Sequence, residues 1–180
     1  MSEEQVALVD ESGTVVGSAP RSVMRRDNLP HVVVAVLVRD PAGRVYVHRR
    51  TETKDVFPDM YDCFVAGCLS AGEELLSAAR RELAEELGVT GVRLESLGST
   101  WFRDERTTHL CHVWTTTYAG PITHQADEIA WGAWLTVDEL RAHLAAPTSP
   151  TGESTAFVPD GRSLVETLLA DGRLADGRLA

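Results

Sequence analysis

The chain has 180 residues and a formal net charge of −10, so we expect one globular domain large enough to bury a core. The acidic surplus argues against a nucleic-acid polymer as partner, because phosphate contacts need Lys and Arg, whereas a bound metal can shield the phosphates of a nucleotide. No apolar run is long enough to span a bilayer and no signal-peptide pattern is present, so we expect a cytoplasmic protein without a membrane partner.

Residues 1–30 predict an N-terminal hairpin followed by a connector. Val6 to Asp10 is a short apolar run, and extended character resumes at Thr14 to Gly17 after a turn. The basic residues of the connector are Arg21, Arg25 and Arg26. This basic segment is either a solvated connector or an arm that faces a phosphate.

The next segment predicts two strands and a basic loop. Val32 to Val38 is a nearly unbroken β-branched run, which indicates a strand that is buried on both faces. Arg44 to Arg49 alternates polar and apolar residues, which indicates a half-buried hairpin partner. The cations Arg49, Arg50 and Lys54 then cluster in a loop that either holds the phosphates of a substrate or is simply exposed.

Residues 67–89 are the most informative part of the chain. At about 100° per residue, a helix would align one apolar stripe, which consists of Leu76, Ala79, Leu83 and Leu87. Glu82 and Glu86 lie one turn apart beside that stripe, and Glu85 lies on their flank. Carboxylates this close raise one another's pKa unless a cation lies between them. Mg²⁺, for which Mn²⁺ can substitute, is the natural counter-charge because it prefers oxygen ligands.

The ends of this predicted helix carry further signals. Ser70 and Glu73 have the spacing of a capping box, and Gly88 stands where a left-handed helix end is expected. Arg81 follows Glu73 by two helical turns, so the pair could tie the preceding loop to the helix. The alternative is a charge-rich surface helix that is merely solvated.

The second half of the chain predicts three strands and two helices. The expected strands are Val92 to Phe102, His109 to Tyr118 and Ile129 to Leu135. The expected helices are Val137 to Ala145, behind a capping box of Thr136 and Glu139, and Pro159 to Ala170 with Leu164, Val165 and Leu168 inward. Residues 147–153 form an expected loop, and a short repeat predicts a flexible tail over residues 171–180. Strands around a few helices indicate an α/β sandwich with a mixed sheet.

The stretch from Gly67 to Val89 resembles the Nudix box at every defined position. The matching residues are Gly67, Glu73, Arg81, Glu82, Leu83, Glu85, Glu86, Gly88 and Val89. The resemblance implies an α/β protein with a Nudix-type α/β/α sandwich, a mixed β-sheet and a loop-helix-loop catalytic motif. We therefore expect a single Nudix hydrolase domain over residues 1–180.

The family resemblance also implies a reaction, the hydrolysis of a diphosphate linked to another moiety, X. Metal ions activate the attacking water and neutralise the phosphoryl oxygens in such a reaction. The implied metal ligands are Glu82, Glu86, Glu85 and the carbonyl of Ala66. Glu85 could instead orient water, and Arg81 belongs to the same catalytic group.

A further carboxylate comes from a later loop in such enzymes. Glu128 is the best candidate for it, because it precedes a short strand after the expected hairpin. Asp104 and Glu105 are less favoured alternatives. The sequence leaves open whether Glu85 or Glu128 acts as the general base.

A finer resemblance connects the chain to the Nudix subgroup related to isopentenyl-diphosphate isomerases. It rests on the N-terminal hairpin with its arginines, on Leu29 to His31, and on a spaced pattern formed by Arg50, Lys54, Pro58 and Asp62. Those isomerases are similar in using Cys and His ligands at the box entrance, where this chain has Ala66 and Cys68. Together with the complete box, these departures count against isomerase chemistry.

Several other residues have a structural and a functional interpretation. His31 is either a metal or substrate contact or a satisfied histidine at a strand end. We expect His109 and His112 not to form a metal cluster with Cys111, and Cys63 and Cys68 to be buried thiols rather than nucleophiles. We expect the remaining aromatic residues to be core or rim rather than base-stacking platforms; they are Trp101, Phe102, Trp131 and Trp134.

Three functions follow as hypotheses. The first is a Mg²⁺-dependent hydrolase of a nucleoside di- or triphosphate or a related nucleoside-diphosphate derivative. The second is a nucleotide-binding sensor with weak catalysis, and the third is an isopentenyl-diphosphate isomerase. The sequence does not define X, and it does not exclude a homodimer.

Overall fold

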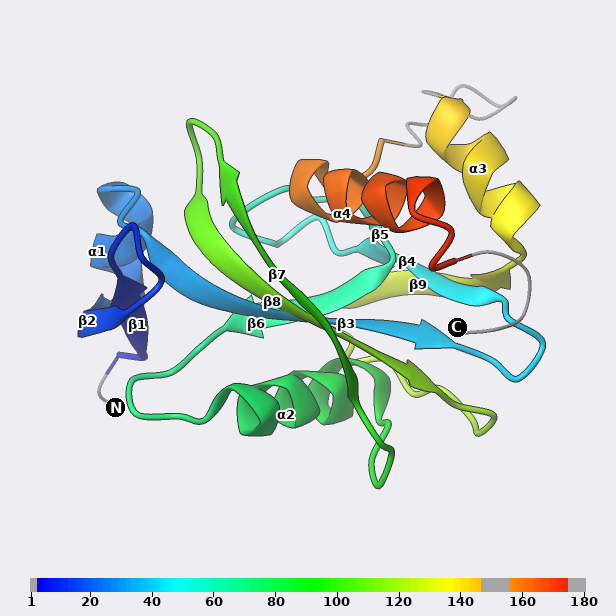
Figure 1. Cartoon of the computed structure of the whole chain (residues 1–180), viewed down its shortest axis with the longest axis horizontal. Coiled ribbons are helices and arrows are strands. Elements are labelled where there is room, and N and C mark those ends of the chain that lie inside the picture. The colour runs from blue at the N-terminus through cyan, green and yellow to red at the C-terminus, as the bar shows by residue number, and fades with distance from the viewer. Residues whose placement is uncertain (1–2, 147–155, 175–180) are drawn as a thin grey trace.

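A computed structural model describes residues 3–146 and 156–174 of the chain. A mixed β-sheet lies between helix α2 on one side and helices α3 and α4 on the other (Figure 1). The predicted α/β sandwich with a mixed sheet is therefore confirmed. Within the described residues, no helix has the length and apolar character needed to cross a membrane.

The elements follow one another in a hairpin, helix, sheet and helix order. The strands are β1 (Gln5–Val9), β2 (Val15–Pro20), β3 (His31–Arg39), β4 (Val45–Arg50), β5 (Tyr61–Asp62), β6 (Phe64–Cys68), β7 (Glu95–Arg103), β8 (Thr108–Thr117) and β9 (Ile129–Leu135). The helices are α1 (Arg21–Arg26), α2 (Leu75–Leu87), α3 (Val137–Ala145) and α4 (Pro159–Ala170).

Strand β3 is the centre of the sheet. It pairs in parallel with β8 along its whole length, from His31 opposite His109 to Arg39 opposite Thr117, and antiparallel with β6. Alternate residues point to opposite faces, so Val34 and Val36 pack in the core under α2, whereas Val33 and Leu37 pack in the core under α3 and α4. The prediction of a strand buried on both faces is confirmed.

Strand β4 differs from its prediction as a half-buried hairpin partner of β3. The two strands are paired only at Arg39 and Val45, and β4 instead pairs with β9 along its length. The residues from Val45 to His48 are all buried. Both faces of β4 are covered, because Val45 packs in the core under α3 and α4 while Tyr46 packs in the core under α2.

The C-terminal helices agree with the sequence. The reciprocal capping box of Thr136 and Glu139 begins α3, and α4 spans Pro159–Ala170 as predicted. Part of the predicted tail is packed, because Leu174 is only 1% exposed and Arg173 donates to the carbonyl of Leu97 at 3.1 Å. The expected loop at residues 147–153 and the rest of the tail, residues 175–180, lie outside the described residues.

The N-terminal hairpin and α1 pack against one end of the sheet. Val6 and Met24 form a small apolar cluster with Cys68, the last residue of β6. Leu8 of β1 is also paired with His31, the first residue of β3. These contacts fix α1 beside the turn that leads from β6 into α2.

Candidate active site

The turn between β6 and α2 differs from the predicted helix cap. Helix α2 begins at Leu75, and its N-cap residue Glu74 makes no side-chain capping bond. Gly72 has a φ of +79°, so the chain turns before the helix begins and Glu73 stays in the loop. The backbone N–H of Ser70 donates to Glu73 Oε2 at 3.2 Å, which closes the turn rather than capping the helix.

Arg81 ties that loop to the helix, as predicted. Its guanidinium donates to both oxygens of Glu73, at 2.9 and 3.0 Å, in the two-pronged geometry that arginine makes with carboxylates. It also donates to Glu82 at 2.6 Å and to Glu85 at 3.3 Å. The hydrogen bonds to Glu73 raise the pKa of Arg81 further, against the effect of burial.

The apolar stripe of α2 is confirmed for most of its residues and wrong for Leu76. Ala79, Leu83 and Leu87 are buried, but Leu76 is 38% exposed. Leu76 lies in the first turn of α2, next to the loop that precedes the helix. Leu87 packs in the core under α2, and its carbonyl accepts a hydrogen bond from the backbone N–H of Thr123.

Gly88 ends α2 in the left-handed conformation that was expected, with a φ of +67°. Its N–H donates to the carbonyl of Ala84, and the N–H of Val89 donates to that of Leu83. A Cβ at Gly88 would also lie 3.2 Å from the Cβ of Thr123. Glycine therefore satisfies both the backbone and the packing at this helix end.

The three acidic residues of α2 differ in burial. The side chains of Glu82 and Glu86 are 12% and 4% exposed, whereas that of Glu85 is 53% exposed. Burial raises the pKa of Glu82. Burial, followed by repulsion from Glu82, raises the pKa of Glu86 to about 8, while Lys54 and Arg50 oppose this shift.

Glu82 lies directly over the backbone of the preceding turn. A Cβ placed on Gly67 would be 1.9 Å from Glu82 Oε1, well inside contact distance. Gly67 is therefore the residue that lets β6 and the carboxylate of Glu82 approach each other. We call Glu82, Glu85 and Glu86 the acidic wall.

The acidic wall lines a cavity of about 680 Å³ that also reaches α1, β3, β8 and the loop after β4. Ala66 and Gly67 of β6 line the same cavity. Leu69 N–H donates to the carbonyl of Val32, and antiparallel ladders alternate every second residue. Ala66, opposite Ala35, is therefore a non-hydrogen-bonded position whose carbonyl points away from β3.

Two of the three predicted phosphate-binding cations line this cavity. Lys54 forms an ion pair with Glu128, which also lines the cavity. Arg50 lines it too and donates to the carbonyls of Val56 and Phe57 at 3.1 and 3.2 Å. These bonds hold the loop where Phe57 has a φ of +52°, a conformation that is costly for a bulky residue.

Arg49 is not among the described residues that line the cavity. It donates to Asp59 at 2.8 Å and lies 6.0 Å from the ring centre of Tyr61. Successive side chains of a strand point to opposite faces, so Arg49 and Arg50 cannot serve the same site.

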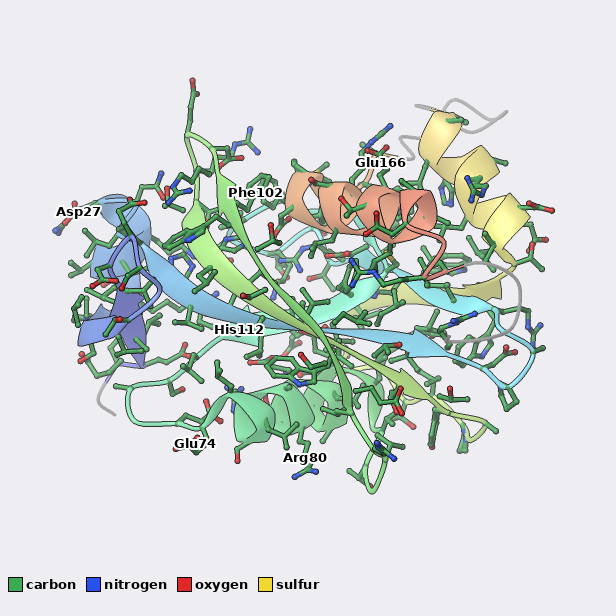
Figure 2. The ribbon with its side chains drawn as sticks, in the orientation of Figure 1. Asp27, Glu74, Arg80, Phe102, His112 and Glu166 are labelled. Carbon is green, nitrogen blue, oxygen red and sulfur yellow. The ribbon has the colours of Figure 1, made fainter. Side chains whose placement is uncertain are left out.

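The arginines of α1 divide in the same way. Arg21 and Arg25 line the cavity and share Asp55, at 3.3 and 3.5 Å, whereas Arg26 pairs with Asp27, whose side chain projects outward (Figure 2). Of the two interpretations of this segment, the arm that faces the site fits Arg21 and Arg25, and the solvated connector fits Arg26.

The model of the NUDIX domain matches residues 29–153 of this sequence, which is more than half of the chain. The chain belongs to the Nudix family. The Nudix box is therefore the motif that builds the acidic wall.

Two relatives similar in sequence carry Nudix names, and a solved structure matches the fold. An uncharacterized Nudix hydrolase of Rhodococcus erythropolis, orf19, is 42% identical over 173 residues, which cover 91% of this chain and 90% of that protein. Nudix hydrolase YfcD of Escherichia coli K12 is 39% identical over 145 residues, 78% of each chain. The crystal structure of DR0079 from Deinococcus radiodurans matches with a TM-score of 0.73 and 29% identity, covering 91% of this chain and 98% of that one. These names support the hydrolase family and not the isomerase-like subgroup.

A second set of cavity-lining residues was not predicted as a group. We call it the composite wall, and its members are Arg25, His31, Thr107, His109 and Asp160. They come from α1, β3, the turn before β8, β8 itself and α4. In the sequence, Arg25 and His31 carried a functional alternative and His109 was considered only as an unfavoured member of a metal cluster, whereas Asp160, in the first turn of α4, gave no local signal.

Asp62 connects the two walls. It is buried, and its Oδ1 accepts from the backbone N–H groups of Cys63 and Phe64 at 2.8 and 3.0 Å. Burial, followed by repulsion from Asp160, raises the pKa of Asp62 to about 7, and Asp62 in turn raises that of Glu86. The spaced pattern in the sequence contained Asp62 but did not indicate this role.

The other candidates lie elsewhere. Asp104 accepts from the N–H groups of Arg106 and Thr107 in a turn, and neither it nor Glu105 is among the described residues lining the cavity. The aromatic candidates are also outside that lining: Trp101, Phe102, Trp131 and Trp134. Trp134 packs edge-on against Tyr46 in the core, at 4.9 Å between ring centres, and Trp131 is 44% exposed.

The cysteines are free and buried, as expected. Cys68 lines the cavity, and Arg21 lies 3.8 Å from its sulfur. Among the described residues, no three carboxylate, imidazole or thiol groups are arranged as a complete metal site. In this arrangement Glu82 is bonded to Arg81 and Glu128 to Lys54.

Proposed function

We propose that this Nudix hydrolase cleaves the phosphoric anhydride of a nucleoside di- or triphosphate, or of a related nucleoside-diphosphate derivative, with Mg²⁺ as cofactor. The observation that supports it best is the composition of one cavity. Partly buried Glu82 and buried Glu86 of the Nudix box share it with Lys54 and with Arg21 and Arg25 of α1. Acids that hold a cation and cations that hold phosphates are the two parts that phosphoryl transfer requires.

The residues of the acidic wall suit a hard divalent cation. Glu82, Glu86 and the carbonyl of Ala66 would hold it, because carboxylate and carbonyl oxygens are its preferred ligands. Once bound, the ion would activate water and neutralise charge on the phosphoryl oxygens. Burial and mutual repulsion disfavour the ionised forms of Glu82 and Glu86, so a cation would stabilise both carboxylates. Mn²⁺ offers the same charge and accepts the same oxygen ligands.

Lys54 is proposed to bind a substrate phosphate, and Glu128 is then proposed to act as the general base. In the structure they neutralise each other, at a place where burial and Arg50 lower the pKa of Lys54. A substrate phosphate would compete for the ammonium group and release the Glu128 carboxylate to accept a proton from water. Glu85 is the alternative base, and Arg81 positions Glu82 through their 2.6 Å bond.

The experiment is a hydrolysis screen with and without Mg²⁺, in which the products are separated by anion-exchange chromatography, because a nucleotide sugar or ADP-ribose would give two phosphomonoesters rather than free phosphate. The panel contains nucleoside di- and triphosphates, dinucleoside polyphosphates, nucleotide sugars and ADP-ribose. ADP-ribose is included because the Nudix domain of Shewanella oneidensis NrtR was solved with it, and that domain shares this fold with a TM-score of 0.59.

The variant Glu86→Gln should lower turnover of the best substrate by ~1,000-fold, because it removes a charge that stabilises the transition state. Glu74→Gln is the matched control, since Glu74 projects from the start of α2 away from the sheet (Figure 2) and is exposed. A Glu86→Gln enzyme as active as the parent would refute the proposal.

Two alternatives give different results in the same experiments. A nucleotide sensor would bind a nucleotide in a calorimeter without releasing phosphate. An isopentenyl-diphosphate isomerase would convert that compound to an allylic product, and Arg50, Lys54 and Asp62 of the subgroup pattern do line the cavity. Ala66 and Cys68, at the positions of that subgroup's Cys and His ligands, favour hydrolysis.

A further inference from the structure

The composite wall forms a continuous polar surface inside the cavity. Arg25 Nη1 donates to Thr107 Oγ1 at 3.4 Å, and Thr107 Oγ1 lies 3.3 Å from His109 Nδ1. His109 Nε2 lies 3.3 Å from Asp160 Oδ2, and the ring of His31 lies 5.7 Å from that of His109. Arg25 and Asp160 lie outside the residues matched by the family model.

His31 has a defined tautomer. Its side chain is 1% exposed, and Nδ1 lies 2.9 Å from the carbonyl of Leu29. A carbonyl can only accept a hydrogen bond, so Nδ1 carries the proton and Nε2 is left as an acceptor. Burial also lowers the pKa of His31, to about 3, which keeps the ring neutral.

The acceptor of His31 is unused by the protein. Nε2 is buried and has no hydrogen-bond partner among the described residues, and the same is true of Asp160 Oδ1. Both residues line the cavity. Buried polar atoms in folded proteins are nearly always paired, and leaving one unpaired is costly, so these two acceptors indicate a ligand that donates hydrogen bonds.

We infer that His31 Nε2 and Asp160 Oδ1 bind hydroxyl groups of the X moiety, such as those of a ribose or another sugar ring, while Lys54 and Arg21 hold the diphosphate beside the acidic wall. The inference rests on the proposed function and narrows its substrate class. Hydroxyl groups donate to two acceptors and can accept from the neighbouring Arg25 guanidinium. An isoprenoid chain has no donor and would leave both acceptors unpaired.

The test uses binding as well as turnover, with ADP, ADP-ribose and UDP-glucose as hydroxylated probes and isopentenyl diphosphate as the apolar one. Histidine ring nitrogens are labelled with ¹⁵N in the Glu86→Gln protein, so that binding is observed without hydrolysis. We expect the Nε2 resonance of His31 to shift with at least one hydroxylated probe and not with isopentenyl diphosphate.

Variants separate recognition from folding. His31→Phe should weaken binding of the preferred hydroxylated probe by ~10-fold and raise KM with little change in kcat, because one hydrogen bond to the substrate is lost. His31→Gln, whose amide oxygen can occupy the place of Nε2, should restore most of the affinity. His112→Phe is the control, because His112 is not among the described residues that line the cavity, and thermal unfolding shows that each variant is folded.

Three results would overturn the inference. They are unchanged affinity in His31→Phe, a saturated complex whose His31 resonance does not move, and isopentenyl diphosphate binding as tightly as every hydroxylated probe. The experiments distinguish a failure of this inference from a failure of the proposed function. An enzyme that releases phosphate with the same KM in His31→Phe would keep the function and lose the inference, whereas binding through His31 without any hydrolysis would do the opposite.

Discussion

The acidic wall and the composite wall face one cavity but are built in different ways. The bonds that shape the acidic wall join residues one, four and eight positions apart, from Arg81 to Glu82, Glu85 and Glu73. The composite wall instead depends on contacts such as that between Arg25 and Thr107, which are 82 positions apart. Helix geometry therefore determines the first wall, and only the assembled fold brings the second together.

In each wall or next to it, one carboxylate lies against a glycine: Glu82 in the acidic wall and Asp62 beside the composite wall. The two side chains differ in how freely they can rotate. Glu82 lies against Gly67 and has a long side chain that can rotate away. Asp62 lies against Gly161 of α4, where a Cβ would be 2.4 Å from its Oδ1, and two backbone N–H groups hold that oxygen. Crowding should thus damage chemistry at the first site and stability at the second.

Among the variants that test this comparison of the two walls, the largest effect is expected for Gly67→Ala. The new methyl group would displace the Glu82 carboxylate, and a misplacement of about 1 Å at a reacting centre can cost ~100-fold in rate. Stability should change by less than ~1 kcal/mol, because the end of a flexible side chain can move. The measurement is kcat/KM on the best substrate of the screen together with urea unfolding.

Gly17→Ala is the control for this variant, since a Cβ there meets no atom within 4 Å. Full activity in Gly67→Ala would show that catalysis does not need the close approach of Glu82 to this turn. The expectation that crowding damages chemistry at the acidic wall would then be wrong.

Gly161→Ala should destabilise the protein by ~2 kcal/mol, the cost typical of an overpacked core. Alanine has the better helix propensity, by ~1 kcal/mol, but the clash falls on a buried carboxylate that cannot rotate without losing its backbone bonds. Urea unfolding measures the effect, with Gly17→Ala again as reference. If Gly161→Ala proves as stable as Gly17→Ala, α4 does not depend on close packing against Asp62.

The same contrast explains how much of the fold was predictable. The buried run of β3, the capping box of α3 and the limits of α4 depend on neighbouring residues, and the sequence predicted them correctly. The pairing of β4 with β9 joins segments that are distant in sequence. No local pattern indicates such a partner, and the alternation in β4 was therefore taken for partial exposure.

The site shows the same division. The box predicted that Glu82 and Glu86 share a face beside the apolar stripe and that Arg81 ties the preceding loop to the helix through Glu73. Arg49 was placed at the substrate although strand alternation separates it from Arg50, so that error was avoidable. The omission of Asp160 from the predicted site could not have been avoided from the sequence, because only the docking of α4 brings it near His109.

The last predicted effect is a pH dependence that distinguishes Glu86 from Asp62 in the metal-free protein. Folding raises the pKa of Glu86 from 4.5 to about 8 and that of Asp62 from 3.8 to about 7. The folded state therefore keeps each proton to higher pH than the unfolded state. The stability contributed by each group is complete below its unfolded pKa and is lost as pH rises through its folded pKa.

Glu86→Gln and Asp62→Asn should each remove one such loss. Relative to the parent, each variant should gain unfolding free energy as pH rises from 5 to 7, by at most ~1.4 kcal/mol per pH unit, in urea titrations with a chelator present. Mg²⁺ should abolish the gain in unfolding free energy for Glu86→Gln, because a bound cation stabilises the ionised Glu86 carboxylate of the parent. The gain for Asp62→Asn should remain largely unchanged. Equal responses of the two variants to Mg²⁺ would mean that the cation does not distinguish the acidic wall from the carboxylate behind it.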